Sequence, residues 1–127
     1  MPLKLFPYEY QRDKIAKMPG TFVFGDNVHH KGFKGQAIIR NLPNAYGFPT
    51  KWLPLTIPGA YFRDSDPETD KIVNKHLLEL ETMLTKGRKI WWPQAGIGTG
   101  LARWPEFAPE ALHKVNNVIQ HWLGFYR

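Results

Sequence analysis

Cysteine is missing from the 127-residue chain, which excludes disulfide bonds, thiolate metal sites and cysteine nucleophiles. The chain also lacks an apolar run of about 18 residues, the length that a membrane-spanning helix needs. Its first ten residues include Lys4 and Glu9 and no apolar stretch of signal-peptide length. We therefore expect a soluble, cytoplasmic protein with no membrane partner.

Repeats and low-complexity segments are absent too, and the length fits one domain with its own core, so we expect a single domain over residues 1–127. His29 and His30 are adjacent, and adjacent side chains seldom point at one ion. Because no carboxylate cluster accompanies them, we expect neither a metal site nor a cofactor.

The net charge of +6 favours anionic partners such as nucleotides, phosphorylated metabolites or nucleic acids. The basic residues are dispersed, however, and no basic run is longer than the pair Arg88 and Lys89. Charge alone therefore leaves a nucleic-acid-binding module open as an alternative without establishing it.

Short β-prone segments alternate with helical ones along the chain. The pattern predicts strands at 21–24, 45–48 and 89–93, and helices at 36–40, from about 67 to 87, and at 105–123. Ser65 or Asp66 can cap the second helix, and Gly87 can end it. This alternation predicts an α/β layered sheet flanked by helices, in which ligands bind beyond the carboxyl ends of the strands.

The loop at 25–35 follows the first predicted strand directly. Gly32 and Gly35 allow its backbone to turn tightly and approach a ligand, and the helix behind it can present free amides to a phosphate. A simple strand-to-helix turn is the alternative interpretation.

The loop at 94–103 carries glycines at alternate positions, Gly96, Gly98 and Gly100. Such a run can arrange backbone amides into an anion-binding nest, although it matches neither the dinucleotide fingerprint nor a P-loop. We expect Gly98→Val to abolish ligand binding with little loss of fold.

A strand followed by Asn27 and a glycine-containing loop, and later Pro-x-x-Gly-Ile-Gly-Thr-Gly-Leu at 93–101, resembles the macrodomain pattern over about residues 21–118. The resemblance implies a macrodomain-like mixed sheet flanked by helices, reduced in size as in a phage-type member, because N-terminal strands of the family are missing. It also implies that the two loops hold the diphosphate of ADP-ribose or a related NAD-derived nucleotide, with Asn27 at the distal ribose. Lys34 stands where relatives often have glycine, and its amine can reach the phosphates.

Arg103 lies beside the second loop, where its guanidinium fork suits a phosphate. The expected ligand-binding residues are Asn27, Gly32, Lys34, Gly35, Gln36, Ala37, Gly96, Ile97, Gly98, Thr99, Gly100, Leu101 and Arg103. Trp104 and Phe107 follow this loop, where an aromatic ring can cover a ribose or adenine, although packing between helix and sheet is the default role for both.

The chain is most similar to the branch of the family that removes terminal ADP-ribose. Lys51, in Pro-Thr-Lys at 49–51, matches the lysine nucleophile of that branch, whereas Ala102 occupies the position of its acid. Asp26 can replace that carboxylate, hold the adenosine or cap the turn. The resemblance thus implies an ADP-ribosyl glycohydrolase with Lys51 and Asp26 as catalytic residues, acting on ADP-ribosylated protein or nucleic acid. A non-catalytic sponge for a nucleotide signal remains the alternative.

Overall fold

Four strands pair in parallel in the computed structural model, which describes residues 2–124. Their order across the sheet is β1–β4–β2–β3. The strands are β1 (Leu3–Phe6), β2 (Thr21–Asn27), β3 (Ala45–Lys51) and β4 (Ile90–Pro93). Each parallel connection must cross over the sheet, and in this chain the crossovers carry the helices.

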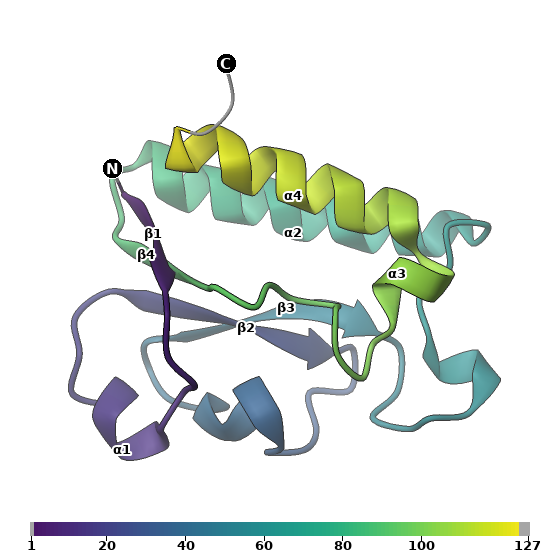
Figure 1. Ribbon diagram of the computed structural model, residues 1–127, viewed down its shortest axis with the longest axis horizontal. Coiled ribbons are helices and arrows are strands. Elements are labelled where there is room, and N and C mark those ends of the chain that lie inside the picture. Colours follow the sequence, from purple (N-terminus) through teal and green to yellow (C-terminus); the bar gives the residue numbers. More distant parts are fainter. Residues whose placement is uncertain (1, 125–127) are drawn as a thin grey trace.

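Helices cover both faces of the sheet (Figure 1). The long helices α2 (Pro67–Thr85) and α4 (Pro109–Leu123) lie side by side on one face. The short α1 (Arg12–Ile15) and the 3-10 helix η1 (Gly35–Ile39) lie on the other. The remaining short elements are η2 (Pro58–Ala60) and α3 (Trp104–Phe107). The expected α/β class, a sheet flanked by helices, is confirmed.

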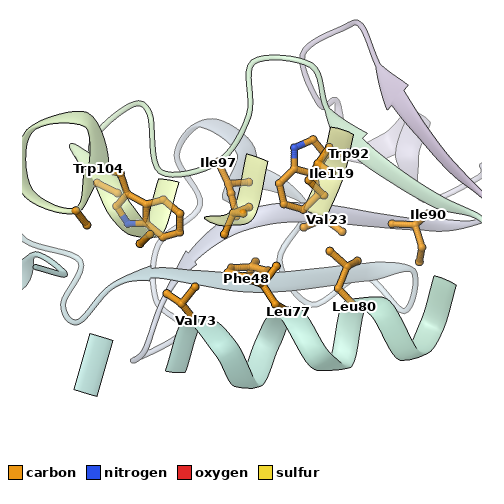
Figure 2. Packing of buried hydrophobic residues seen from close by; sticks show 14 of the residues in the cluster. Val23, Phe48, Val73, Leu77, Leu80, Ile90, Trp92, Ile97, Trp104 and Ile119 are labelled. Carbon is orange, nitrogen blue, oxygen red and sulfur yellow. The ribbon is translucent and has the colours of Figure 1, made fainter. Parts of the chain in front are cut away.

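The larger core lies between the sheet and the two long helices. Figure 2 shows Leu77 and Leu80 of α2 facing Phe48 of β3 and Val23 of β2. Leu80, Phe48 and Val23 are completely buried. The helical spacing of apolar residues in α2 therefore predicted the buried face correctly.

Aromatic rings fill the smaller core on the opposite face. Phe22 of β2 stacks on Trp91 of β4, with ring centroids 5.9 Å apart and an interplanar angle of 16°. Phe6 meets the edge of Phe22 at 5.4 Å, and Ile39 of η1 is fully buried in the same cluster. This second core fixes the short η1 helix against β2, and so fixes the loop that precedes it.

Local capping decides the ends of α2. The Asp66 carboxylate accepts a hydrogen bond from the Glu68 amide at 3.0 Å, so Asp66 rather than Ser65 is the N-cap. Beyond Thr85 the chain reverses through Gly87, whose φ of +80° suits a residue without a Cβ.

Three features differ from the sequence-based expectation. The strand β1 was missed, because four residues in which only Leu3 and Phe6 are buried give too short a pattern. Within residues 2–124 the strands pair in parallel and do not form the mixed sheet that was expected, and antiparallel pairing is limited to an isolated bridge between Lys51 and Tyr61. The last helix is divided into α3 and α4, because Pro109 has no amide to continue the hydrogen bonding.

Within residues 2–124, no helix has both the length and the apolar character required to cross a bilayer.

We predict that Leu80→Ala lowers the free energy of unfolding by about 2–5 kcal/mol, because it leaves a cavity between α2 and the sheet. Urea denaturation followed by circular dichroism measures the change. Leu78→Ala is the matched control on the same helix, because Leu78 is 69% exposed and Leu80 is 0% exposed. We expect the control to change stability by less than about 0.5 kcal/mol. Equal losses in the two variants would contradict the packing described here.

Candidate functional site

A cleft of about 610 Å³ opens where β2, β3 and β4 reach their carboxyl ends. Three segments form its walls: the first loop and η1, the end of β3 with the turn that follows, and the loop after β4. Its lining residues are Gly25, Asp26, Asn27, Lys31, Gly32, Phe33, Lys34, Gly35, Gln36, Ala37, Arg40, Thr50, Lys51, Pro54, Ala95, Gly96, Gly98, Thr99, Gly100, Leu101 and Ala102. A volume of this size is typical of sites for small organic ligands.

The loop after β4 carries unpaired backbone amides, and its residues 98–101 line this cleft. Gly96 and Gly98 adopt left-handed conformations, with φ of +81° and +76°. Within the described residues, the five successive amides of 97–101 donate no hydrogen bond. Successive amides around left-handed glycines form the concave arrangement that binds anions.

Gln36 joins the two loops through both ends of its side-chain amide. Its Oε1 accepts from the Gly25 amide at 2.8 Å, and its Nε2 donates to the Gly96 carbonyl at 2.8 Å. Gln36 was expected to bind ligand, but both ends of its side-chain amide are engaged within the protein. In this structure its side chain fixes the spacing between the walls of the cleft.

Trp104 fixes the second loop from below. The Trp104 backbone amide donates to the Gly98 carbonyl at 2.8 Å, and its indole Nε1 donates to the Thr50 carbonyl at 2.8 Å. Trp104 is fully buried, and Phe107 packs on Tyr61 with centroids 4.8 Å apart. Both aromatic residues have the packing role that was the default expectation, and neither lines the cleft.

Asp26 is a buried carboxylate with both oxygens engaged. Its Oδ1 accepts from the Asn27 amide at 2.7 Å and pairs with Arg40 at 2.6 Å, while Oδ2 lies 2.7 Å from His30 Nδ1. Gly47 on β3 leaves room for this side chain, because a Cβ there would lie 2.4 Å from Asp26 Oδ2. Asp26 therefore organises the loop in this structure, and the catalytic role expected for it stays a prediction.

The Arg40 guanidinium donates hydrogen bonds to two backbone carbonyls of the first loop. Its Nε donates to the Gly32 carbonyl at 2.8 Å, and a terminal nitrogen donates to the Lys31 carbonyl at 3.1 Å. The Lys31 carbonyl also accepts from Asn27 Nδ2 at 2.8 Å. Arg40 and Asn27 thus hold the carbonyls of this loop. The amides of 32–35, in contrast, donate no hydrogen bond within the described residues.

The short η1 helix differs from the helix that was expected to help the first loop bind a phosphate. It is a 3-10 helix of only five residues, so it lacks the aligned peptide dipoles of a longer α-helix. Phosphate binding at this wall would depend on the amides themselves and on the charges of Lys31 and Lys34, both of which are exposed.

Lys51 ends β3 inside the cleft and is 8% exposed. Its Nζ donates to the Leu55 carbonyl and lies 4.9 Å from the centre of the Tyr61 ring. Burial lowers the pKa of Lys51 below that of a free lysine, since desolvation disfavours the charged amine. Lys51 forms no ion pair with another residue of the described range 2–124.

The structure brings most of the expected site residues to one cleft. Asn27, Lys51 and Ala102 line it together with the glycines of both loops. Ile97 and Arg103 do not: Ile97 is 3% exposed in the core, and Arg103 pairs with Glu106.

Sequence reasoning missed several lining residues, which are Gly25, Lys31, Phe33, Arg40, Thr50, Pro54 and Ala95. Lys31 and Phe33 flank the first glycine of their loop, so their position beside Gly32 was a usable signal. The role of Arg40 had no local signal, because its partner Asp26 is distant in sequence.

The described residues contain no group of three or more His, Cys, Asp or Glu side chains arranged to hold a metal ion.

Comparison with known families gives a match over residues 5–118. The chain belongs to a family of unknown function (DUF7831). The match runs from within β1 to within α4 and includes all three walls of the cleft. No curated protein matches the chain, and no solved structure matches it.

The surroundings of Gly98 contradict the expectation that Gly98→Val would spare the fold. A Cβ at Gly98 would lie 2.4 Å from the Trp104 ring, and the φ of +76° is strained for any other residue. We predict that Gly98→Ala lowers the free energy of unfolding by about 2–5 kcal/mol, from backbone strain and overpacking together.

Gly100→Ala is the control, because a Cβ at Gly100 meets no atom within 4 Å and its φ is not in the left-handed region. Thermal unfolding measures both variants, and the control should melt close to the wild-type temperature. A Gly98→Ala protein as stable as the wild type would show that the loop does not press on Trp104.

Proposed function

We propose that the cleft binds ADP-ribose or a related NAD-derived nucleotide through its diphosphate. The observation that carries the proposal is the run of unpaired amides at 97–101, in a loop whose residues 98–101 line the same cleft as the loop at 32–35. Amide donors to a charged phosphate oxygen make hydrogen bonds about twice as strong as neutral ones. The exposed Lys31 and Lys34 add positive charge at the same wall.

The resemblance of both loops to the macrodomain pattern supports ADP-ribose as the particular ligand. Asn27 lines the cleft, although its side chain already contacts both the carbonyl and the amide of Lys31. A ligand ribose at Asn27 must therefore use the remaining hydrogen-bonding capacity of the Asn27 amide group. ADP-ribosylated protein or nucleic acid is the corresponding macromolecular partner.

A second candidate function, ADP-ribosyl hydrolysis, is favoured by one observation, the buried Lys51 amine with its lowered pKa. Its neutral Nζ would attack the anomeric carbon while the bond to the departing group breaks, and a proton must reach that group. Water would then release the sugar and restore the amine. Asp26 is committed to Arg40, and Ala102 carries no acid, so the proton donor is the missing part. Binding without efficient turnover is therefore our preferred form of the proposal.

We predict a micromolar dissociation constant for ADP-ribose in a calorimetric titration, on the order of −8 kcal/mol. AMP should bind much more weakly, because it lacks the diphosphate and the distal ribose. Strong binding to nucleic acid that falls steeply with salt and ignores free ADP-ribose would support the alternative of a nucleic-acid module. Absence of heat at millimolar ADP-ribose would contradict the proposal.

We predict that Gly100→Val reduces ADP-ribose affinity by at least tenfold, about 1.4 kcal/mol, because it adds a branched side chain to the lining of the cleft. Gly59→Val is the matched control, since Gly59 is also open to a Cβ and lies outside the lining. Both variants should retain the wild-type melting temperature without ligand, and only the control should retain the ligand-induced rise. Equal affinities of the two variants for ADP-ribose would show that the ligand does not bind at this loop.

We predict slow or absent release of ADP-ribose from modified protein by the wild type, because a missing general acid commonly costs about 10²–10⁴ in rate. Ala102→Asp should raise the rate, since position 102 lines the cleft together with Lys51. Lys51→Ala should remove any turnover while ADP-ribose still binds. Rapid turnover that survives Lys51→Ala would contradict both the lysine mechanism and the preference for binding.

A further inference from the structure

Phe33 is the one aromatic side chain among the described residues that line the cleft. It lies in the first loop between Gly32 and Lys34 and is 51% exposed. The ring is half in solvent and belongs to neither hydrophobic core of the described residues. A ligand that enters the cleft and packs against the ring would explain why Phe33 is placed there.

The backbone next to Phe33 and the Phe33 ring each have a contact with an arginine side chain. The carbonyl of Gly32, the residue before Phe33, is held by Arg40. The guanidinium of Arg12 lies 6.0 Å from the centre of the Phe33 ring. Arg12 is itself fixed by hydrogen bonds to the carbonyls of Ile38 at 2.8 Å and Arg40 at 2.6 Å. An aromatic platform held in this way loses little entropy when a ligand stacks on it.

We infer that Phe33 is the platform on which the nucleobase of the ligand stacks, so that the cleft selects nucleotides over simple diphosphates and sugar phosphates. The inference rests on the proposed function, because it needs the phosphates to occupy the amide loops. A base has an extended π-face and an aromatic side chain stacks on it whatever the base. Leu101, which lines the cleft from the second loop and is 70% exposed, adds further apolar surface to it. The subsite accordingly recognises the presence of a base rather than its identity.

Titrations of four ligands test this inference: ADP-ribose and ADP, which carry a base, and inorganic pyrophosphate and ribose 5-phosphate, which do not. We expect Phe33→Ala to weaken ADP-ribose and ADP by about 5- to 150-fold, the range for loss of one stacked base. The affinity for pyrophosphate and ribose 5-phosphate should not change. Phe33→Trp, which keeps a π-face, should bind ADP-ribose at least as tightly as the wild type.

Tyr8→Ala is the matched control, because Tyr8 is an aromatic residue that is 75% exposed and lies outside the cleft lining. It should leave all four affinities unchanged. Nuclear Overhauser contacts between the adenine protons of bound ADP-ribose and the Phe33 ring should be present in the wild type.

The outcomes separate this inference from the proposed function. If Phe33→Ala weakens pyrophosphate as much as ADP-ribose, Phe33 shapes the loop and the base subsite is overturned. If Phe33→Ala leaves ADP-ribose affinity unchanged, the subsite is also overturned, while the diphosphate site stands. If the wild type binds none of the four ligands, the proposed function fails and the subsite fails with it.

Discussion

The buried ion pair between Asp26 and Arg40 is the interaction on which the cleft depends. Both side chains are almost completely buried, and their atoms lie 2.6 Å apart. Breaking such a pair by removing one partner typically costs about 3–5 kcal/mol, because the other charge stays buried without compensation. The pair ties the end of β2 to the residue just after η1. It therefore closes the first loop into a fixed wall, with Gly32 and Lys31 held by the same guanidinium.

The sheet makes this ion pair possible by leaving space for it. Asp26 lies opposite Pro49 in the β2–β3 register, and the next pair is Asn27 with Lys51, so that Thr50 of β3 is the extra residue at this register shift. On the neighbouring strand Gly47 supplies the gap that the carboxylate occupies. Across the cleft, Gln36 sets the distance to the second loop with a single side chain. The walls are thus positioned by side-chain hydrogen bonds to backbone, and the amides of 32–35 and 97–101 have no hydrogen-bond acceptor within the described residues.

The parts that sequence predicted are those with local causes. Asp66 and the helical spacing of apolar residues define α2, and the glycines at 96, 98 and 100 define the second loop, because capping, periodicity and glycine runs act over a few residues. The division of the last helix at Pro109 had a local signal that periodicity concealed. The roles of Arg40 and Gln36 had no local signal, because the residues that they contact are distant in sequence and come close only in the folded parallel sheet. The close packing of Gly98 against the Trp104 ring is likewise a tertiary contact, which a local sequence pattern does not indicate.

The same constraint that builds the cleft limits its chemistry. A carboxylate that must manage a proton at the anomeric carbon needs a free oxygen, and both oxygens of Asp26 are engaged by Arg40, His30 and the Asn27 amide. Releasing Asp26 for acid–base work would also release the wall on which the proposed ligand site depends. Lys51 has the burial that favours a neutral amine, but its hydrogen-bonding partner is the Leu55 carbonyl, which cannot give a proton to a leaving group. An arrangement that spends its acidic side chain on shape is better suited to holding a nucleotide than to cleaving one.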